Sequence, residues 1–121
     1  MPFLQCIRLG IKKAECRVVS PYIKKFKIGE NLLLQSKREF ALCRIGYLNF
    51  YKNFETMISD EGVYNLIPFA KDEKDALQIY KGFPGASRVT INGCCAIGVK
   101  WLEGVLEAVS VEKFLRGDLI K

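Results

Sequence analysis

Residues 31–50, NLLLQSKREFALCRIGYLNF, decide the fold. An apolar run over residues 31–35 and a longer one over residues 39–50 are both typical of buried strands. The polar residues Ser36, Lys37 and Arg38 between the two runs are typical of a tight turn. Because a short connection joins strands that run in opposite directions, we predict a β-hairpin over this stretch.

A second hairpin is predicted over residues 88–102. Residues 88–91 and 94–102 have the pattern of strands, and Asn92-Gly93 between them is a dipeptide that favours two-residue hairpin turns. The adjacent Cys94 and Cys95 point to opposite faces of such a strand. We therefore interpret these two cysteines as packing residues rather than a redox pair.

A third, shorter strand is predicted over residues 14–18. Ala14 and Cys16 alternate there with Glu15 and Arg17, so one face of the strand is apolar and the other is charged. The segment that follows breaks at Ser20-Pro21 and leads into a turn.

Capping residues and the helical spacing of apolar side chains predict four helices. They lie over residues 2–10, after the N-cap Asn53, between the N-cap Asp72 and Gly82, and over residues 110–117. The order of these elements favours an α+β domain around a mostly antiparallel curled sheet with flanking helices.

Length and composition indicate one folded domain. The chain has 121 residues, of which 50% are hydrophobic and 26% charged. It contains no histidine, which excludes imidazole-based catalysis, and its five cysteines lack zinc-type spacing, so we expect neither a metal nor a cofactor. No signal-like or membrane-length apolar segment is present, so we expect an intracellular protein with reduced thiols and no membrane segment.

The positive charge is concentrated near the N-terminus. Residues 8–27 hold seven Lys and Arg side chains against the single acid Glu15, which accounts for the whole net charge of +6. Such a cluster attracts phosphates and favours nucleic acid as a partner, although a solvated basic face that keeps the protein soluble has the same pattern.

Residues 10–17, GIKKAECR, fit the pattern G-x-K-x-x-E-x-R, which is the signature of ASCH domains. Further landmarks follow in the order typical of that family, namely an Ile-Gly-Glu turn at residues 28–30, a long strand, residues 51–55 leading into a helix, Tyr80 at the end of a second helix, and a glycine-containing strand over residues 93–99. The chain therefore resembles the ASCH family over about residues 2–102.

The resemblance implies a PUA-like, mostly antiparallel β-barrel with a cleft beside the signature, and binding of RNA. Residues 103–121 lie outside it and are predicted to form a C-terminal extension, with a short helix packed on or beside the barrel. Some small ASCH proteins resemble nucleoside amidohydrolases, in which the signature lysine activates a threonine three residues later; others are described as ribonucleases. Here the lysine is Lys12 but Glu15 occupies the threonine position. The amidohydrolase nucleophile is therefore missing.

Several side chains are candidates for this cleft. Glu15 and Arg17 share one strand face, and they either contact a ligand together or pair with each other. Lys12 is predicted to enter the cleft. Tyr22 with Lys24 and Lys25 forms a mixture of rings and cations found in binders of single-stranded nucleic acid, and the same mixture is found in amphipathic packing segments. The predicted ligand-binding residues are Lys12, Lys13, Glu15, Arg17, Tyr22, Lys24 and Lys25.

Other polar and aromatic residues have plainer interpretations. Tyr47, Tyr51 and Trp101 either line a base-stacking pocket or fill the core. Asp60 and Glu61 either supply a general acid or metal ligand or form a solvated helix end.

We predict a non-catalytic RNA-binding module with a basic cleft for a base or nucleotide. One alternative is a ribonuclease or modified-nucleoside hydrolase, with Lys12 as base or electrostatic catalyst and Glu15 as acid and base. A second alternative is a protein-interaction adaptor that contacts its partner through residues 103–121.

Overall fold

The computed structural model describes residues 3–105. In chain order its elements are α1 (Phe3–Arg8), β1 (Ala14–Val18), α2 (Pro21–Lys24), β2 (Asn31–Ser36), β3 (Glu39–Tyr51), α3 (Phe54–Glu61), α4 (Val63–Leu66), α5 (Glu73–Lys81), the short 3₁₀ helix η1 (Ala86–Arg88), α6 (Val89–Asn92) and β4 (Cys94–Val105). The domain is therefore α+β, as the sequence predicts.

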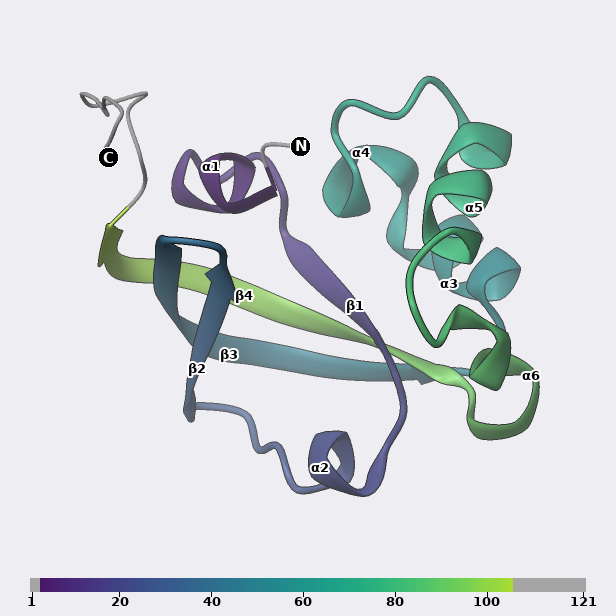
Figure 1. Ribbon diagram of the computed structural model, residues 1–121, viewed down its shortest axis with the longest axis horizontal. Coiled ribbons are helices and arrows are strands. Elements are labelled where there is room, and N and C mark those ends of the chain that lie inside the picture. Colours follow the sequence, from purple (N-terminus) through teal and green to yellow (C-terminus); the bar gives the residue numbers. More distant parts are fainter. Residues whose placement is uncertain (1–2, 106–121) are drawn as a thin grey trace.

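The strands form one curled antiparallel sheet in the order β1-β4-β3-β2, an open half-barrel. The long strands β3 and β4 pair along most of their length, and register shifts interrupt the pairing after Leu42 and after Ile45. Figure 1 shows α3, α4, α5 and α6 grouped beside β1 and one end of the long strands, with α1 and α2 apart from them.

Strand β4 separates two hydrophobic clusters because its side chains alternate between the faces of the sheet. Cys94 and Ala96 belong to the cluster beneath α3 and α5, whereas Cys95 and Ile97 belong to the cluster beneath α1 and the β2–β3 hairpin. All four side chains are fully buried. The prediction that the two cysteines point to opposite faces and serve packing is confirmed.

The first hairpin and both middle helices also follow the predictions. β2 and β3 pair from Asn31 opposite Arg44 to Ser36 opposite Glu39. Asn53 and Asp72 cap α3 and α5, and each side chain accepts a hydrogen bond from a backbone N–H three residues later.

The second predicted hairpin is wrong. Residues 88–91 belong to η1 and α6, and Gly93 ends α6 with φ 75° instead of closing a hairpin turn. A two-residue hairpin turn and a helix end both need a positive φ that glycine tolerates, so Asn-Gly is compatible with either of them. A Cβ at this position lies 2.6 Å from the carbonyl oxygen of Tyr51, so Gly93 also allows the chain to pass close to the end of β3.

Two further stretches differ from the sequence predictions. Pro21 starts the short helix α2, with Ser20 as its N-cap, in a segment that was predicted only as a break before a turn. β4 continues to Val105, beyond the predicted end of this strand at residue 102. The helix predicted over residues 110–117 lies outside the described residues.

Candidate functional site

The signature lysine is buried. Lys12 is 1% exposed, and its Nζ donates hydrogen bonds to the carbonyl oxygens of Ala14 at 2.7 Å and Leu66 at 2.5 Å. The same Nζ lies 3.4 Å from Glu15 Oε1 and 5.3 Å from the centroid of the Phe3 ring. The structure therefore places Lys12 beneath the surface, where it joins β1 to the end of α4, rather than at the surface of a cleft. Burial lowers the pKa of Lys12, and the neighbouring Glu15 carboxylate opposes that shift.

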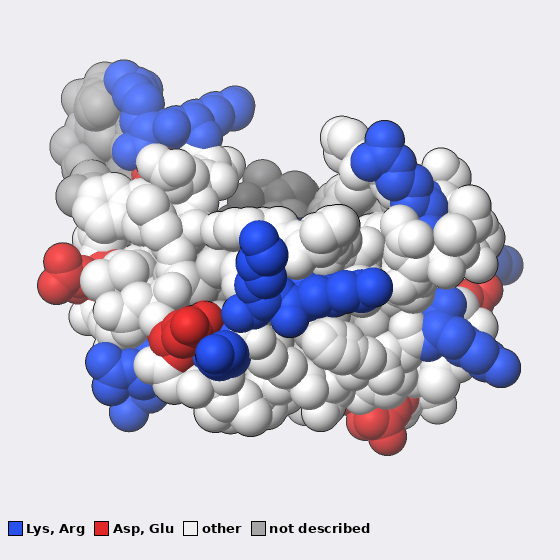
Figure 2. Space-filling model, turned by 90° about the horizontal axis from the view of Figure 1, so that it is seen from below, with Lys and Arg blue, Asp and Glu red and all other residues white. Residues whose placement is uncertain are grey.

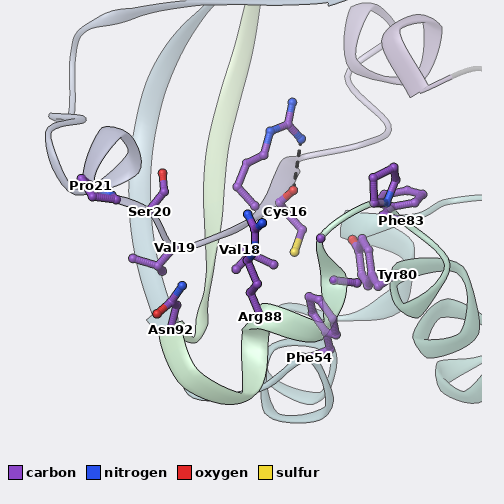
Figure 3. Close-up of a pocket in the computed structure, with 14 residues that line it drawn as sticks. Cys16, Val18, Val19, Ser20, Pro21, Phe54, Tyr80, Phe83, Arg88 and Asn92 are labelled. Carbon is purple, nitrogen blue, oxygen red and sulfur yellow. Dashed lines mark hydrogen bonds between the residues drawn. The ribbon is translucent and has the colours of Figure 1, made fainter.

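Glu15 and Arg17 lie on the same face of β1 and contact each other. Arg17 Nη1 donates to Glu15 Oε2 and also to the carbonyl oxygen of Cys16 at 3.1 Å, the latter shown by the dashed line in Figure 3. The side chain of Glu15 is 17% exposed and that of Arg17 is 44% exposed. Lys12, Glu15 and Arg17 therefore contact one another in series, and the Arg17 side chain is the most exposed of the three. Lys13 is exposed beside them.

The main pocket, of about 630 Å³, lies between β1 and the segment from α5 to α6. Its volume is within the range of about 300–1,000 Å³ typical of small-molecule sites. The pocket lining contains two arginines, three aromatic rings and no acidic residue; the residues are Cys16, Arg17, Val18, Val19, Ser20, Pro21, Phe54, Tyr80, Phe83, Pro84, Gly85, Ala86, Arg88 and Asn92. Figure 3 shows Phe54, Tyr80 and Phe83 on one side of it, facing Cys16 and Val18 of β1.

Arg88 is a pocket residue that the sequence analysis missed. It stands at the junction of η1 and α6, and its exposed side chain extends toward Val18 of β1 (Figure 3). Within residues 3–105 the structure records neither a salt bridge nor a hydrogen bond from its guanidinium. The 3₁₀ turn that follows Gly85 carries Arg88 at the pocket wall.

Tyr80 also forms part of this pocket. It stacks on Phe54 with ring centroids 5.5 Å apart and meets Phe83 edge-on at 6.0 Å. Its hydroxyl is buried, and no described side chain or backbone group is placed to hydrogen-bond with it. The helical spacing of Tyr80 predicted its burial but carried no signal for an unpaired hydroxyl.

Two further hollows share lining residues with the main pocket. A cavity of about 130 Å³ shares Arg17, Tyr80 and Phe83 with it and adds Glu15. A groove of about 290 Å³ shares Arg17 and extends to Tyr22 of α2. Arg17 therefore borders the main pocket, the smaller cavity and the groove.

The lysines at the end of the basic segment are exposed on and near α2. Lys24, Lys25 and Lys27 are exposed on and after α2, and Tyr22 is 69% exposed with its ring edge-on to Phe26, 5.0 Å between centroids. Figure 2 views the face that carries α2; Lys and Arg side chains project from its middle, and acidic side chains lie mostly nearer its edges.

Asp60 and Glu61 hold α3 against β3. Tyr51 donates to both carboxylates at 2.5 Å, and Tyr47 donates to Glu61 at 3.1 Å. Burial and the Glu61 carboxylate raise the pKa of Tyr47 to about 12. None of these four residues lines the main pocket, although Tyr51 borders a separate hollow of about 440 Å³ and Asp60 borders another of about 500 Å³. Trp101 packs beneath α1, where Arg8 lies over its ring at 5.8 Å.

The thiols and carboxylates do not form a metal site within residues 3–105, where no group of three or more His, Cys, Asp or Glu side chains is arranged to hold an ion. All five cysteines are unpaired. Cys16 lines the main pocket, but its contact with the Cys94 thiol and its burial raise its pKa, which disfavours a reactive thiolate. Each helix within the same residues is too short or too polar to cross a bilayer.

The fold recurs in two solved structures. Hypothetical protein PH0355 matches with a TM-score of 0.75 and 22% sequence identity, over 83% of this chain and 91% of that one. Protein PF0455 from Pyrococcus furiosus matches with a TM-score of 0.69 and 27% identity, over 84% of this chain and 90% of that one. No protein-family model matches the sequence, and no curated protein matches it significantly. The chain thus shares its α+β half-barrel with these proteins, and neither name states an activity.

Proposed function

We propose that this protein is a non-catalytic RNA-binding module of the PUA-like ASCH type, and that the main pocket accepts one nucleotide of a single strand. The observation that carries the proposal is the composition of the pocket wall, in which Arg17 and Arg88 accompany three aromatic rings and no carboxylate lines the hollow. The planar guanidinium group of arginine donates paired hydrogen bonds to phosphate oxygens, and aromatic rings stack on bases.

The surface around the pocket supports a path for neighbouring nucleotides. A separate groove borders Arg17 and is also lined by Tyr22, whose exposed side chain belongs to the same short helix as the exposed Lys24. A ring that stacks with a base, flanked by cations that contact the backbone, is the arrangement by which proteins bind single strands. We assign the pocket to one nucleotide and α2 to the strand that continues from it.

The family resemblance enters through the signature on β1. Lys12 fixes β1 against α4, and Glu15 orients the Arg17 guanidinium. In this proposal Lys12 positions the strand, Glu15 positions Arg17, and only Arg17 contacts RNA.

Binding of a fluorescein-labelled single-stranded RNA octamer, measured by anisotropy between 50 and 200 mM NaCl, tests the proposal. We expect affinity to fall steeply with salt, because each phosphate contact contributes about 0.7 to the slope of log K against log salt. Arg88→Ala should weaken binding about tenfold at low salt and reduce the slope, since charge-assisted contacts contribute about 1.5–3 kcal/mol. Lys74→Ala, which removes an exposed lysine from α5 outside the pocket, is the matched control. Undetectable binding at 50 mM, or binding insensitive to salt, refutes the proposal.

The alternative of an enzyme has one observation in its favour, the lowered pKa of Lys12 beside a carboxylate. Its Nζ, however, is already occupied by two carbonyl acceptors and is shielded from solvent. A general base must reach the proton it removes, so we rank this alternative second. Turnover of RNA or modified nucleosides that disappears in Glu15→Gln, with the fold retained, would reverse the ranking. The adaptor alternative rests on residues 103–121, most of which lie outside the described residues.

A further inference from the structure

The Tyr80 hydroxyl is a buried polar group without a protein partner. The residue is 2% exposed, and within residues 3–105 no group forms a hydrogen bond with its oxygen. Leaving a buried hydroxyl unpaired lowers stability, and native structures retain such groups rarely. The other tyrosines of the sheet contrast with it, because Tyr47 and Tyr51 both donate to carboxylates.

The position of Tyr80 links this hydroxyl to the pocket. The residue lines both the main pocket and the smaller cavity that contains Glu15, so it forms part of the wall between them. Phe54 stacks on one face of its ring, which fixes the orientation of the side chain. A phenol held this rigidly is suited to recognise a ligand at one position.

The chemistry of the surroundings determines which partner the hydroxyl takes. Burial and the nearby Cys16 and Glu15 raise the pKa of Tyr80, so the phenol keeps its proton and acts as a donor at neutral pH. Its oxygen is recessed in the wall. An acceptor that protrudes from a ring, such as a carbonyl oxygen, reaches a recessed donor more easily than a nitrogen within the ring does.

We propose that Tyr80 is the specificity-determining residue of the pocket, and that its hydroxyl donates a hydrogen bond to a ring carbonyl of the bound base. The pocket then favours bases that carry such a carbonyl, as uracil does, over adenine, which has none. This inference rests on the proposed function, with Arg17 and Arg88 contacting the phosphates on either side of the base.

The affinities of U8 and A8 RNA octamers for the wild-type protein and for Tyr80→Phe test it at 50 mM NaCl. Tyr80→Phe should bind U8 about tenfold more weakly, because the carbonyl is left unpaired, and bind A8 as the wild type does. The free variant should melt at the same temperature as the wild type or higher, because the change removes an unpaired buried hydroxyl without opening a cavity.

Tyr47→Phe is the matched control, since it deletes a hydroxyl that is bonded to Glu61 and lies outside the pocket. It should melt at a lower temperature and bind both octamers normally. Equal losses for U8 and A8 in Tyr80→Phe, or no loss for either, overturn the inference while leaving RNA binding intact. A lower melting temperature of free Tyr80→Phe also overturns it, because the hydroxyl is then a structural group. A wild-type protein that binds neither octamer refutes the proposed function itself.

Discussion

The two ends of the basic segment place their lysines in opposite environments. At the start, Lys12 is buried against backbone carbonyls and Glu15. At the end, Lys24 and Lys25 are exposed on α2. This difference in burial shows that one cluster of positive residues in a sequence contains side chains with two different roles. One lysine holds the strand that carries the site, and the others remain available for a polyanion.

Removing the buried cation should give the largest effect. Lys12→Ala should lower the free energy of unfolding by about 4 kcal/mol, because it removes the donor of two carbonyl oxygens and the buried cation beside the half-buried Glu15 carboxylate. Urea denaturation monitored by the fluorescence of Trp101 measures this. The adjacent and exposed Lys13→Ala should stay within about 0.5 kcal/mol of the wild type. Equal stabilities of the two variants would contradict the contrast between the ends of the segment.

The pH dependence of the free energy of unfolding also distinguishes the buried Lys12 from the exposed lysines. Burial lowers the pKa of Lys12 in the folded protein from its ordinary value of 10.5. At pH values between the lowered pKa of folded Lys12 and 10.5, the unfolded chain binds more protons than the folded one. Lys12 therefore makes the free energy of unfolding rise with pH in this range. Lys12→Met keeps the length of the side chain and lacks the titrating group, so its stability should rise less than that of the wild type as pH approaches 10. Parallel curves for the two proteins in urea titrations would show that Lys12 does not titrate with a lowered pKa.

The exposed end should show the smallest change in stability and a clear change in binding. The double variant Lys24→Ala/Lys25→Ala should unfold within about 0.5 kcal/mol of the wild type, since neither side chain is buried. If each lysine contacts a phosphate, the slope of log K against log salt for a single-stranded RNA octamer should fall by about 1.4 in total. An unchanged slope would place the RNA away from α2.

Most of the scaffold could be predicted from the sequence because it depends on local patterns. The hairpin of β2 and β3, the caps Asn53 and Asp72, and the alternation along β1 all depend on residues close to one another in the chain. The hairpin predicted at Asn92-Gly93 is wrong because the positive φ of Gly93 is compatible with either a hairpin turn or the end of a helix. Packing against the end of β3 settles which one forms, and that contact is between residues distant in sequence.

The site was predictable only in part. The alternation along β1 placed Glu15 and Arg17 on one face, and their contact is observed. Charge alone gave no means of telling Lys12 from Lys13, because their difference depends on the carbonyl oxygen of Leu66, 54 residues away. Arg88 and Tyr80 reach the pocket through η1 and α5, so no spacing in the sequence relates either residue to β1.

The amino-acid sequence by itself determined the first hairpin, the caps of the two middle helices, the net positive charge near the N-terminus and the alternating faces of the strands, because neighbouring residues impose these properties. Only the tertiary structure decided which cations are buried, which are exposed, and which aromatic rings share a pocket with Arg17. The physical reason is that burial and hydrogen-bond partners depend on which distant segments pack together, and desolvation then gives chemically identical side chains different roles.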